Sequence, residues 1–340
     1  MKLGTITLNG PEGSNLLGFL CALGTFATFR RQWPRLPLRL HWIQDSGWNP
    51  VLAGIPECVA AKPERIGSVL HQSLLLRRLQ EHFDLPTGDA KPYLNPDKVL
   101  AQDYRSFAAR SELGDPKNPR SFLDFLASFG CDTETGEGAT VKATPLCVLG
   151  SSQQYFFKMM RELSQEPVAE VLDKNGKVAN QPALAKDPAT QVAHIQEALL
   201  GPWQYRDDSP TLKLDSGEDR RHALRRLNPT DNRAPIRTVR GANRLAIEAL
   251  SLFPCAPSAH GVQTAGFTRI ERQTVMSWPV WSTPLSLDAV KTLLNHAELT
   301  HEEPRRSVLE PLGVTSVFRA VRMQQDKGKA SFSISTSVLA

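Results

Sequence analysis

The sequence lacks the short motifs with which many enzymes hold phosphate groups or activate a nucleophile. Neither G-x-x-x-x-G-K-[ST] nor G-x-G-x-x-G occurs, so nothing supports nucleotide hydrolysis or dinucleotide binding. The G-x-S-x-G elbow of hydrolases and the H-E-x-x-H motif of zinc proteases are also missing. The eight histidines are scattered, and none is next to an aspartate. We therefore predict that the protein is not an enzyme and uses no cofactor.

Cysteines are few and widely spaced. The five cysteines are residues 21, 58, 131, 147 and 255. Their odd number and the absence of C-x-x-C spacing argue against a disulfide framework and against a zinc site. His296 and His301 with Glu302 and Glu303 resemble a ligand cluster most, but a solvated helix end explains them better, and Asp207–Asp208 read as surface acids. The sequence predicts a reduced, cytoplasmic protein without a metal.

Long hydrophobic runs are also missing. The longest apolar stretch, residues 16–29, has 14 residues, which is too short to cross a bilayer. Glu12 precedes it in place of the basic residues of a signal peptide. Apolar residues make up 41% of the 340 residues and charged residues 22%, as in globular proteins. We expect no membrane partner, and the net charge of +5 mildly favours a polyanionic one.

Acids are almost absent from one arginine-rich stretch. Between residues 220 and 244 there is one acid, Asp231, and eight arginines. The arginines are Arg220, Arg221, Arg225, Arg226, Arg233, Arg237, Arg240 and Arg244. Turn-forming residues 228–234 lead into an apolar helix expected near Gly241, and a helix N-terminus beside arginines favours phosphate. A salt-bridged helix surface is the alternative, but it needs more acids.

Two further segments carry candidate contacts. The block at 144–163 places five polar or basic residues at and after an expected helix start. These are Ser152, Gln153, Gln154, Lys158 and Arg161. Ordinary helix capping explains the serine, and a nucleic-acid contact would be an addition to it. The alternating, β-branched segment 313–324 predicts a strand that carries Arg319 and Arg322. Trp278 and Trp281 are read as core residues, with base stacking as the alternative.

The expected fold class is α+β, with small antiparallel sheets around a buried N-terminal helix. We expect an N-terminal lobe at 1–165, a linker with a connecting helix at 166–204, and a basic C-terminal lobe at 205–340. The expected helices are 16–31, 64–83, 121–130, one that follows Gln154 and runs through Leu163, 190–201, a short basic one at about 219–227, 241–253 and 286–296. The expected strands are 3–8, 38–43, 267–276 and 313–324, with a closing strand in the tail. Residues 47–52 are read as a turn and 86–119 as a looser region.

Several blocks resemble a known family. GFLCALG at 18–24, SSQQYFFKMMREL at 151–163, NPTDNRAPIRTVRGANRLAIEALSLFP at 228–254 and VFRAVR at 317–322 are similar in pattern and order to type I CRISPR proteins. The chain resembles accessory or large-subunit-like proteins of the type I-G (formerly I-U) branch over most of its length. The likeness is strongest at 14–29, 144–163 and 228–254.

The resemblance implies a subunit of a crRNA-guided surveillance complex, Cascade. Such a subunit contacts crRNA, reads the protospacer-adjacent motif in double-stranded target DNA, helps to open the R-loop and helps to dock the helicase–nuclease. The candidates on this chain are Arg233, Arg237, Arg240 and Asn243, with Gln153 and Gln154, because arginine and amide side chains read base edges. A protein-interaction adaptor that tethers the helicase–nuclease is the competing interpretation.

Overall fold

The chain has an α+β fold. The computed structural model describes residues 2–73, 95–114, 119–133, 136, 138–147, 156–164, 188–208, 211–217, 237–259, 261–325 and 329–339. The α-helices are α1 (Leu16–Gln32), α2 (Glu57–Ala60), α3 (Ile66–Ser73), α5 (Ala101–Gly114), α6 (Pro119–Ala127), α7 (Phe156–Ser164), α8 (Pro188–Leu200), α10 (Arg240–Ala249), α11 (Leu287–Leu294) and α12 (Arg306–Leu309). The 3-10 helices are η1 (Pro63–Arg65), η2 (Pro96–Lys98), η3 (Leu250–Leu252), η4 (Ala297–Thr300) and η5 (Glu310–Leu312).

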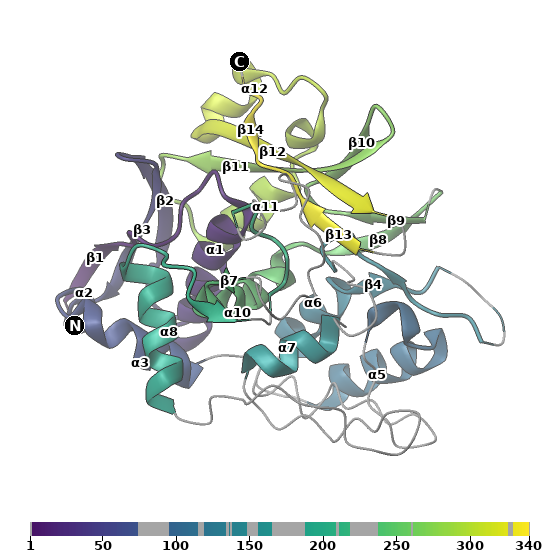
Figure 1. Ribbon diagram of the computed structural model, residues 1–340, viewed down its shortest axis with the longest axis horizontal. Helices are drawn as coiled ribbons and strands as arrows, with labels where there is room; N and C mark the ends of the chain where they lie inside the picture. The colour runs from purple at the N-terminus through teal and green to yellow at the C-terminus, as the bar shows by residue number, and fades with distance from the viewer. Residues whose placement is uncertain are drawn as a thin grey trace.

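The strands form small antiparallel sheets around the helices (Figure 1). One sheet has the order β1-β3-β2, from Leu3–Thr7, Trp48–Pro56 and Arg39–Gln44. A larger sheet has the order β10-β11-β12-β13, from Phe267–Ile270, Gln273–Trp281, Val314–Gln325 and Lys329–Phe332, and β14 (Thr336–Ser337) also pairs with β12. Three two-stranded antiparallel sheets are also described: β4 (Gly130–Cys131) with β5 (Lys142–Ala143), β6 (Asp207–Asp208) with β7 (Arg237–Thr238), and β8 (Cys255–Ser258) with β9 (Gly261–Thr264).

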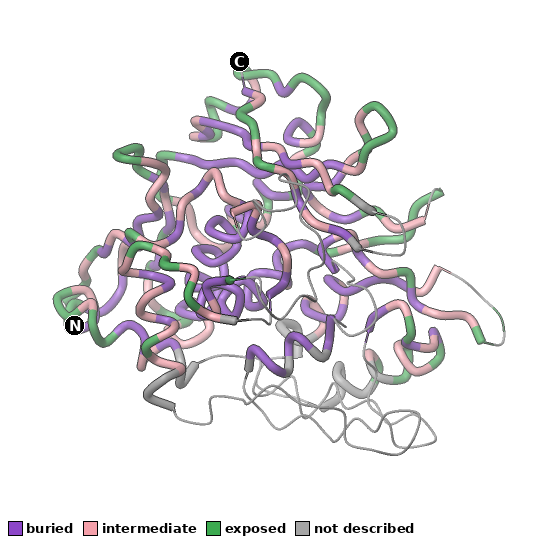
Figure 2. The backbone as a smooth tube through the Cα atoms, in the orientation of Figure 1, coloured by how far each residue is buried: buried purple, intermediate pink, exposed green. Residues whose placement is uncertain are grey.

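Helix α1 is the centre of the core, as its sequence predicts. Every residue from Leu16 to Phe29 is buried, and the side chain of Asn15 accepts the backbone N–H of Gly18 as an N-cap. The helix packs against α10 at the position of Gly24. A Cβ atom at Gly24 would lie 1.9 Å from the carbonyl oxygen of Leu245, so only glycine allows this approach. Figure 2 shows both helices as buried elements at the centre of the molecule.

The larger sheet joins the same core through its aromatic residues. Trp278 and Trp281 on β11 are fully buried, and their indole nitrogens donate to the carbonyls of Gly13 and Leu40, each at 2.8 Å. Their core assignment is confirmed. One hydrophobic cluster runs from Ile6 to Leu339, so the described residues of both expected lobes share a single core. Helix α8, expected as a connector, belongs to it through Ile195, Ala198 and Leu199.

Several local predictions are wrong. Residues 47–52 are not a turn, because β3 runs through them as the central strand of its sheet. The Asn-Pro pair that indicated a turn is tolerated because the last pair with β1 is Thr7–Val51, so Pro50 lies just beyond that ladder. Gly130 is not a helix C-cap. Helix α6 ends at Ala127, and Gly130 starts β4, where a Cβ atom would meet the carbonyl of Lys142 at 2.3 Å.

Other boundaries shift in a similar way. The expected strand 267–276 is a hairpin of β10 and β11, which turns at Glu271 and Arg272 with φ of 48° and 68°. Neither residue type is typical of a left-handed turn, so this turn could not be predicted from the residue types. Part of the expected loose region is helix α5, and the described part of the helix expected at 64–83 is α3. None of the helices that the structure describes combines the length and the apolarity of a membrane span.

Candidate nucleic-acid interface

The described part of the arginine-rich stretch begins at β7 and continues into α10. Strand β7 pairs with β6, with Asp207 opposite Thr238 and Asp208 opposite Arg237. Five of the candidate arginines lie outside the described residues, as do three candidate residues of the block at 144–163. These are Arg220, Arg221, Arg225, Arg226, Arg233, Ser152, Gln153 and Gln154. Lys158 and Arg161 belong to α7, but their side chains also lie outside the described part.

Arg237 and Arg240 both donate to backbone carbonyl oxygens. Nη1 of Arg237, an exposed residue, donates to the carbonyl of Arg206 at 2.6 Å. Nη2 of Arg240 donates to the carbonyl of Glu162 on α7, also at 2.6 Å. This second bond joins the described end of the arginine stretch to α7, which lies within the block at 144–163.

The N-terminus of α10 is occupied by a carboxylate of the chain itself. Oδ2 of Asp207 accepts the backbone N–H of Arg240 at 2.8 Å, and Nε2 of His194 on α8 lies 3.3 Å from its Oδ1. Burial would raise the pKa of Asp207, but these two contacts and the charges of His194 and Arg240 lower it overall. We expected a phosphate at this helix end, but the Arg240 N–H already donates to Asp207. Asp207 therefore caps the helix and is not a simple surface acid.

Asn243 is a structural residue and not a reader of bases. Its side chain is fully buried on α10. Nδ2 donates to Oγ1 of Thr238 at 2.8 Å and to the carbonyl of Val239 at 3.1 Å, while Oδ1 accepts the N–H of Leu212 at 2.8 Å. These bonds tie the residues before α10 and the segment at 211–212 to the helix. The assignment of Asn243 to nucleic-acid contact is corrected, because no part of its amide reaches the surface.

Arg244, one of the eight arginines of the stretch, is neutralised inside the protein. Its Nη1 lies 2.9 Å from Oε1 of Glu248, one helical turn further along α10. Arg31 of α1 pairs with the other oxygen of the same carboxylate. Glu248 is fully buried, so this network contributes to the α1–α10 contact. The i, i+4 spacing of Arg244 and Glu248 is visible in the sequence and could have separated this arginine from the rest.

Arg319 and Arg322 lie on β12 as expected, and both are partly buried. Nη1 and Nη2 of Arg319 donate to the carbonyls of Glu302 and His301 at 2.8 and 2.6 Å. Nε of Arg322 donates to the carbonyl of Pro145 at 3.1 Å. Burial is the largest influence on both guanidinium groups, and it lowers the pKa of each.

Two of the four described candidate arginines contact the block at 144–163. Arg240 donates to the carbonyl of Glu162 on α7, and Arg322 donates to the carbonyl of Pro145. These contacts join segments that are far apart in the sequence. Glu162 accepts from Arg240 and His194 contacts Asp207, and neither residue lies in a sequence motif that could have identified it. The expected single basic groove depends on residues outside the described part and stays a prediction.

Neither a protein-family model nor a curated protein sequence matches this chain. Among the described residues, no three His, Cys, Asp or Glu side chains form a group that could hold a metal ion. The functional assignment consequently depends on the arginine geometry and on the resemblance of the sequence blocks.

Proposed function

We propose that this chain is a non-catalytic nucleic-acid-binding subunit of a crRNA-guided type I CRISPR effector complex (Cascade). In this role it recognises double-stranded target DNA at the protospacer-adjacent motif, assists R-loop opening, and contacts crRNA, neighbouring Cascade subunits and the helicase–nuclease in the cytoplasm. The resemblance of the sequence blocks supplies the biological context. The arrangement of the described arginines supplies the physical argument.

The observation that carries the proposal is how these guanidinium groups are held. Arg237, Arg240, Arg319 and Arg322 each donate to backbone carbonyl oxygens. A carbonyl carries no net charge, so such a bond orients the guanidinium but does not itself neutralise its charge. The planar fork is then fixed in advance, which reduces the conformational entropy lost when a phosphate binds.

Burial adds a driving force for an anionic partner. Desolvation lowers the pKa of Arg240, Arg319 and Arg322, and nearby groups of the chain offset this only in part. A lowered arginine pKa means that the environment disfavours the positive charge. A phosphate oxygen placed beside the guanidinium would remove that penalty and add a charge-assisted hydrogen bond. Polyanions therefore suit these sites better than neutral partners.

The test is a salt series of DNA binding with matched arginine variants. Double-stranded DNA with and without the protospacer-adjacent motif is titrated with the chain alone and with crRNA-loaded partner subunits. We expect motif-dependent binding in the assembled complex, with affinity that falls steeply as salt rises. Combining Arg319→Ala and Arg322→Ala should lower the affinity and reduce the slope of log K against log salt by about 2, one for each lost contact.

Arg305→Ala is the matched control, because Glu298 already neutralises that guanidinium at 2.8 Å. It should leave both affinity and slope unchanged. If the double variant behaved like this control, the arginine assignment would be wrong. If the chain bound no DNA in either state but still formed a stable complex with the helicase–nuclease, it would be a protein-interaction adaptor.

A further inference from the structure

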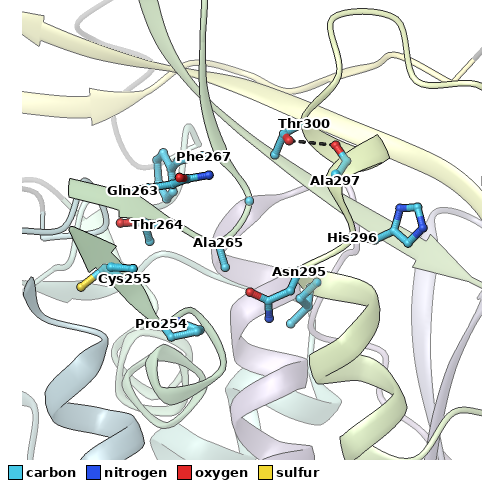
Figure 3. A pocket seen from close by; sticks show the side chains of 13 residues that line it. Pro254, Cys255, Gln263, Thr264, Ala265, Phe267, Asn295, His296, Ala297 and Thr300 are labelled. Atoms are coloured by element: carbon cyan, nitrogen blue, oxygen red, sulfur yellow. Dashed lines mark hydrogen bonds between the residues drawn. The ribbon is translucent and has the colours of Figure 1, made fainter. Parts of the chain in front are cut away.

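A hollow outside the arginine sites opens between two distant segments of the chain. It has a volume of about 290 Å³ and lies between the β8–β9 hairpin, the start of β10, and the end of α11 with η4 (Figure 3). Its walls include Cys255, Gln263, Phe267, Asn295, His296 and Thr300. The volume is near the lower end of the range of roughly 300–1,000 Å³ for small-molecule sites. It suits one compact ring system.

The lining carries no formal charge. None of the described residues that line the hollow is Asp, Glu, Lys or Arg. Sγ of Cys255 donates to the carbonyl of Ala127 at 2.7 Å, and burial raises the pKa of this thiol to about 12, so it stays protonated. Nδ1 of His296 accepts the N–H of Glu298 at 3.3 Å. A phosphate or carboxylate would find no lysine or arginine among the described residues that line the hollow.

Two carboxamides face the space from opposite sides. Gln263 on β9 and Asn295 after α11 are both exposed, and Figure 3 shows their side chains reaching toward the space between the hairpin and the helix end. Nδ2 of Asn295 donates to the carbonyl of Lys291 at 2.8 Å, which fixes the plane of the amide and leaves its oxygen as an acceptor. A fixed primary amide offers a donor or an acceptor to the edge of a flat, uncharged ligand.

The inner wall is aromatic. Phe267 is 7% exposed, and its ring centroid lies 6.2 Å from that of Phe332 on β13. Phe332 therefore holds the ring in place. An aromatic ring beside two amide groups combines a stacking surface with hydrogen-bonding edges, which is the combination that proteins use for splayed, unpaired bases.

The hollow is linked to the two arginines of β12. Thr264 in its wall donates through Oγ1 to Thr144 at 3.0 Å, and the next residue, Pro145, accepts Nε of Arg322. On the other side, Thr300 is followed by His301, whose carbonyl accepts Nη2 of Arg319 at 2.6 Å. The segments that wall the hollow thus also anchor the guanidinium groups assigned to phosphates.

The geometry points to a pocket for a single unpaired nucleobase, held between the Gln263 and Asn295 amides and against Phe267, while the backbone on either side runs toward Arg319 and Arg322. This inference rests on the proposed function for the nucleic acid that supplies the base. The pocket itself recognises a neutral, planar, hydrogen-bonding ring.

Adenosine is the probe, because carboxamides pair with the N6 and N7 edge of adenine and because a nucleoside has no phosphate. Its binding to the full chain is followed by saturation-transfer NMR, with ribose 5-phosphate as the comparison ligand. We expect saturable binding of adenosine and none of ribose 5-phosphate. Combining Gln263→Ala with Asn295→Ala should weaken adenosine binding by about tenfold or more, since both amide contacts are lost.

Two variants make the result specific. Gln44→Ala removes an exposed amide from β2 and should have no effect on adenosine. Ala297→Trp, at the exposed rim, should block adenosine while it keeps both amides. Because Gln263 and Asn295 are exposed, their replacement should not unfold the protein.

The outcomes separate this inference from the proposed function. If adenosine does not saturate up to its solubility limit, or binds equally to the double alanine variant, the pocket assignment is wrong even where salt-dependent DNA binding is intact. If adenosine binds and the variants remove it while DNA binding is absent, the pocket stands and the proposed function fails. Equal binding of ribose 5-phosphate would also overturn the nucleobase assignment.

Discussion

Two arginines of helix α10, one turn apart, have opposite environments. Arg244 points into the protein and pairs with Glu248, which also binds Arg31. Arg240 donates to the backbone carbonyl of Glu162, and its buried Nε has no hydrogen-bond partner. The first arginine belongs to a closed ion-pair network. The second keeps a charge that burial disfavours, as its lowered pKa indicates.

The comparison shows that arginine content alone does not define a binding surface. In the sequence, Arg240 and Arg244 are members of the same acid-poor stretch. In the structure they differ in the group that accepts their hydrogen bond: a carboxylate for Arg244 and a backbone carbonyl for Arg240. A carboxylate acceptor uses the charge for folding, whereas a carbonyl acceptor orients the guanidinium and leaves its net charge in place.

Removing the carboxylate of the buried network should have the largest effect on the fold. Glu248→Ala leaves Arg31 and Arg244 without their counter-charge between α1 and α10. Breaking a buried pair in this way costs roughly 3–5 kcal/mol, because an uncompensated charge remains. Urea unfolding followed by circular dichroism would show this loss as a lower midpoint. Glu303→Ala, at an exposed glutamate, is the control and should shift the midpoint little. Similar midpoints for the two variants would mean that the network contributes little.

The next largest loss of stability is expected from a substitution that pushes α1 and α10 apart. Gly24→Ala would place a Cβ atom 1.9 Å from the carbonyl of Leu245, so α1 and α10 must separate. Overpacking of this kind costs about 1–3 kcal/mol. Gly201→Ala is the matched control, because its Cβ would meet nothing nearer than the Glu197 carbonyl at 3.6 Å. Calorimetry should show a lower unfolding temperature for Gly24→Ala only, and equal temperatures would contradict the close contact.

Much of the core could be predicted from the sequence. The apolar run at 16–29 and the alternation at 313–324 are strong patterns, and both elements form where expected. Ser286 caps α11, the helix that was expected at 286–296. These features succeed because hydrophobic periodicity and capping act over one or two turns of chain.

The candidate site was harder to predict, because its roles depend on contacts between distant segments. Asn243 looked like a polar reader beside arginines, but Leu212 and Thr238 use its amide inside the protein. Asp207 looked like a loop acid, but β6–β7 pairing carries it to the start of α10. The pocket between Gln263 and Asn295 has no local signature either, since its walls meet only when β9 and the end of α11 pack together.

Arg240→Gln tests whether Arg240, unlike Arg244, contributes to DNA binding more than to stability. Burial disfavours the charge of Arg240, and the substitution removes its hydrogen bond to the Glu162 carbonyl, so the free energy of unfolding should change by about 1 kcal/mol. The same variant should reduce the salt slope of DNA binding by about 1. Urea unfolding and a salt series on one preparation would measure both. A large loss of stability with an unchanged slope would place Arg240 in the same class as Arg244.

The smallest effect concerns an arginine–carboxylate pair nearer the surface. Arg305 binds Glu298 through Nε, Nη2 and its backbone N–H, and these hydrogen bonds lower the pKa of Glu298 to about 2. Since the folded pKa is below the ordinary value of 4.5, the pair stabilises the fold fully above that pH and loses its contribution as the pH falls toward 2.

Glu298→Gln keeps the shape of this side chain but removes the titration. The difference in stability between the natural chain and this variant should be constant above about pH 5 and shrink as the pH falls below the ordinary carboxyl range. Urea midpoints measured from pH 7 to pH 3 would test this. A difference that grew on acidification would reverse the sign of the coupling and remove Glu298 from the group of carboxylates that neutralise an arginine. The charge of Arg305 would then not be neutralised by Glu298, and Arg305→Ala could no longer serve as the control for DNA binding.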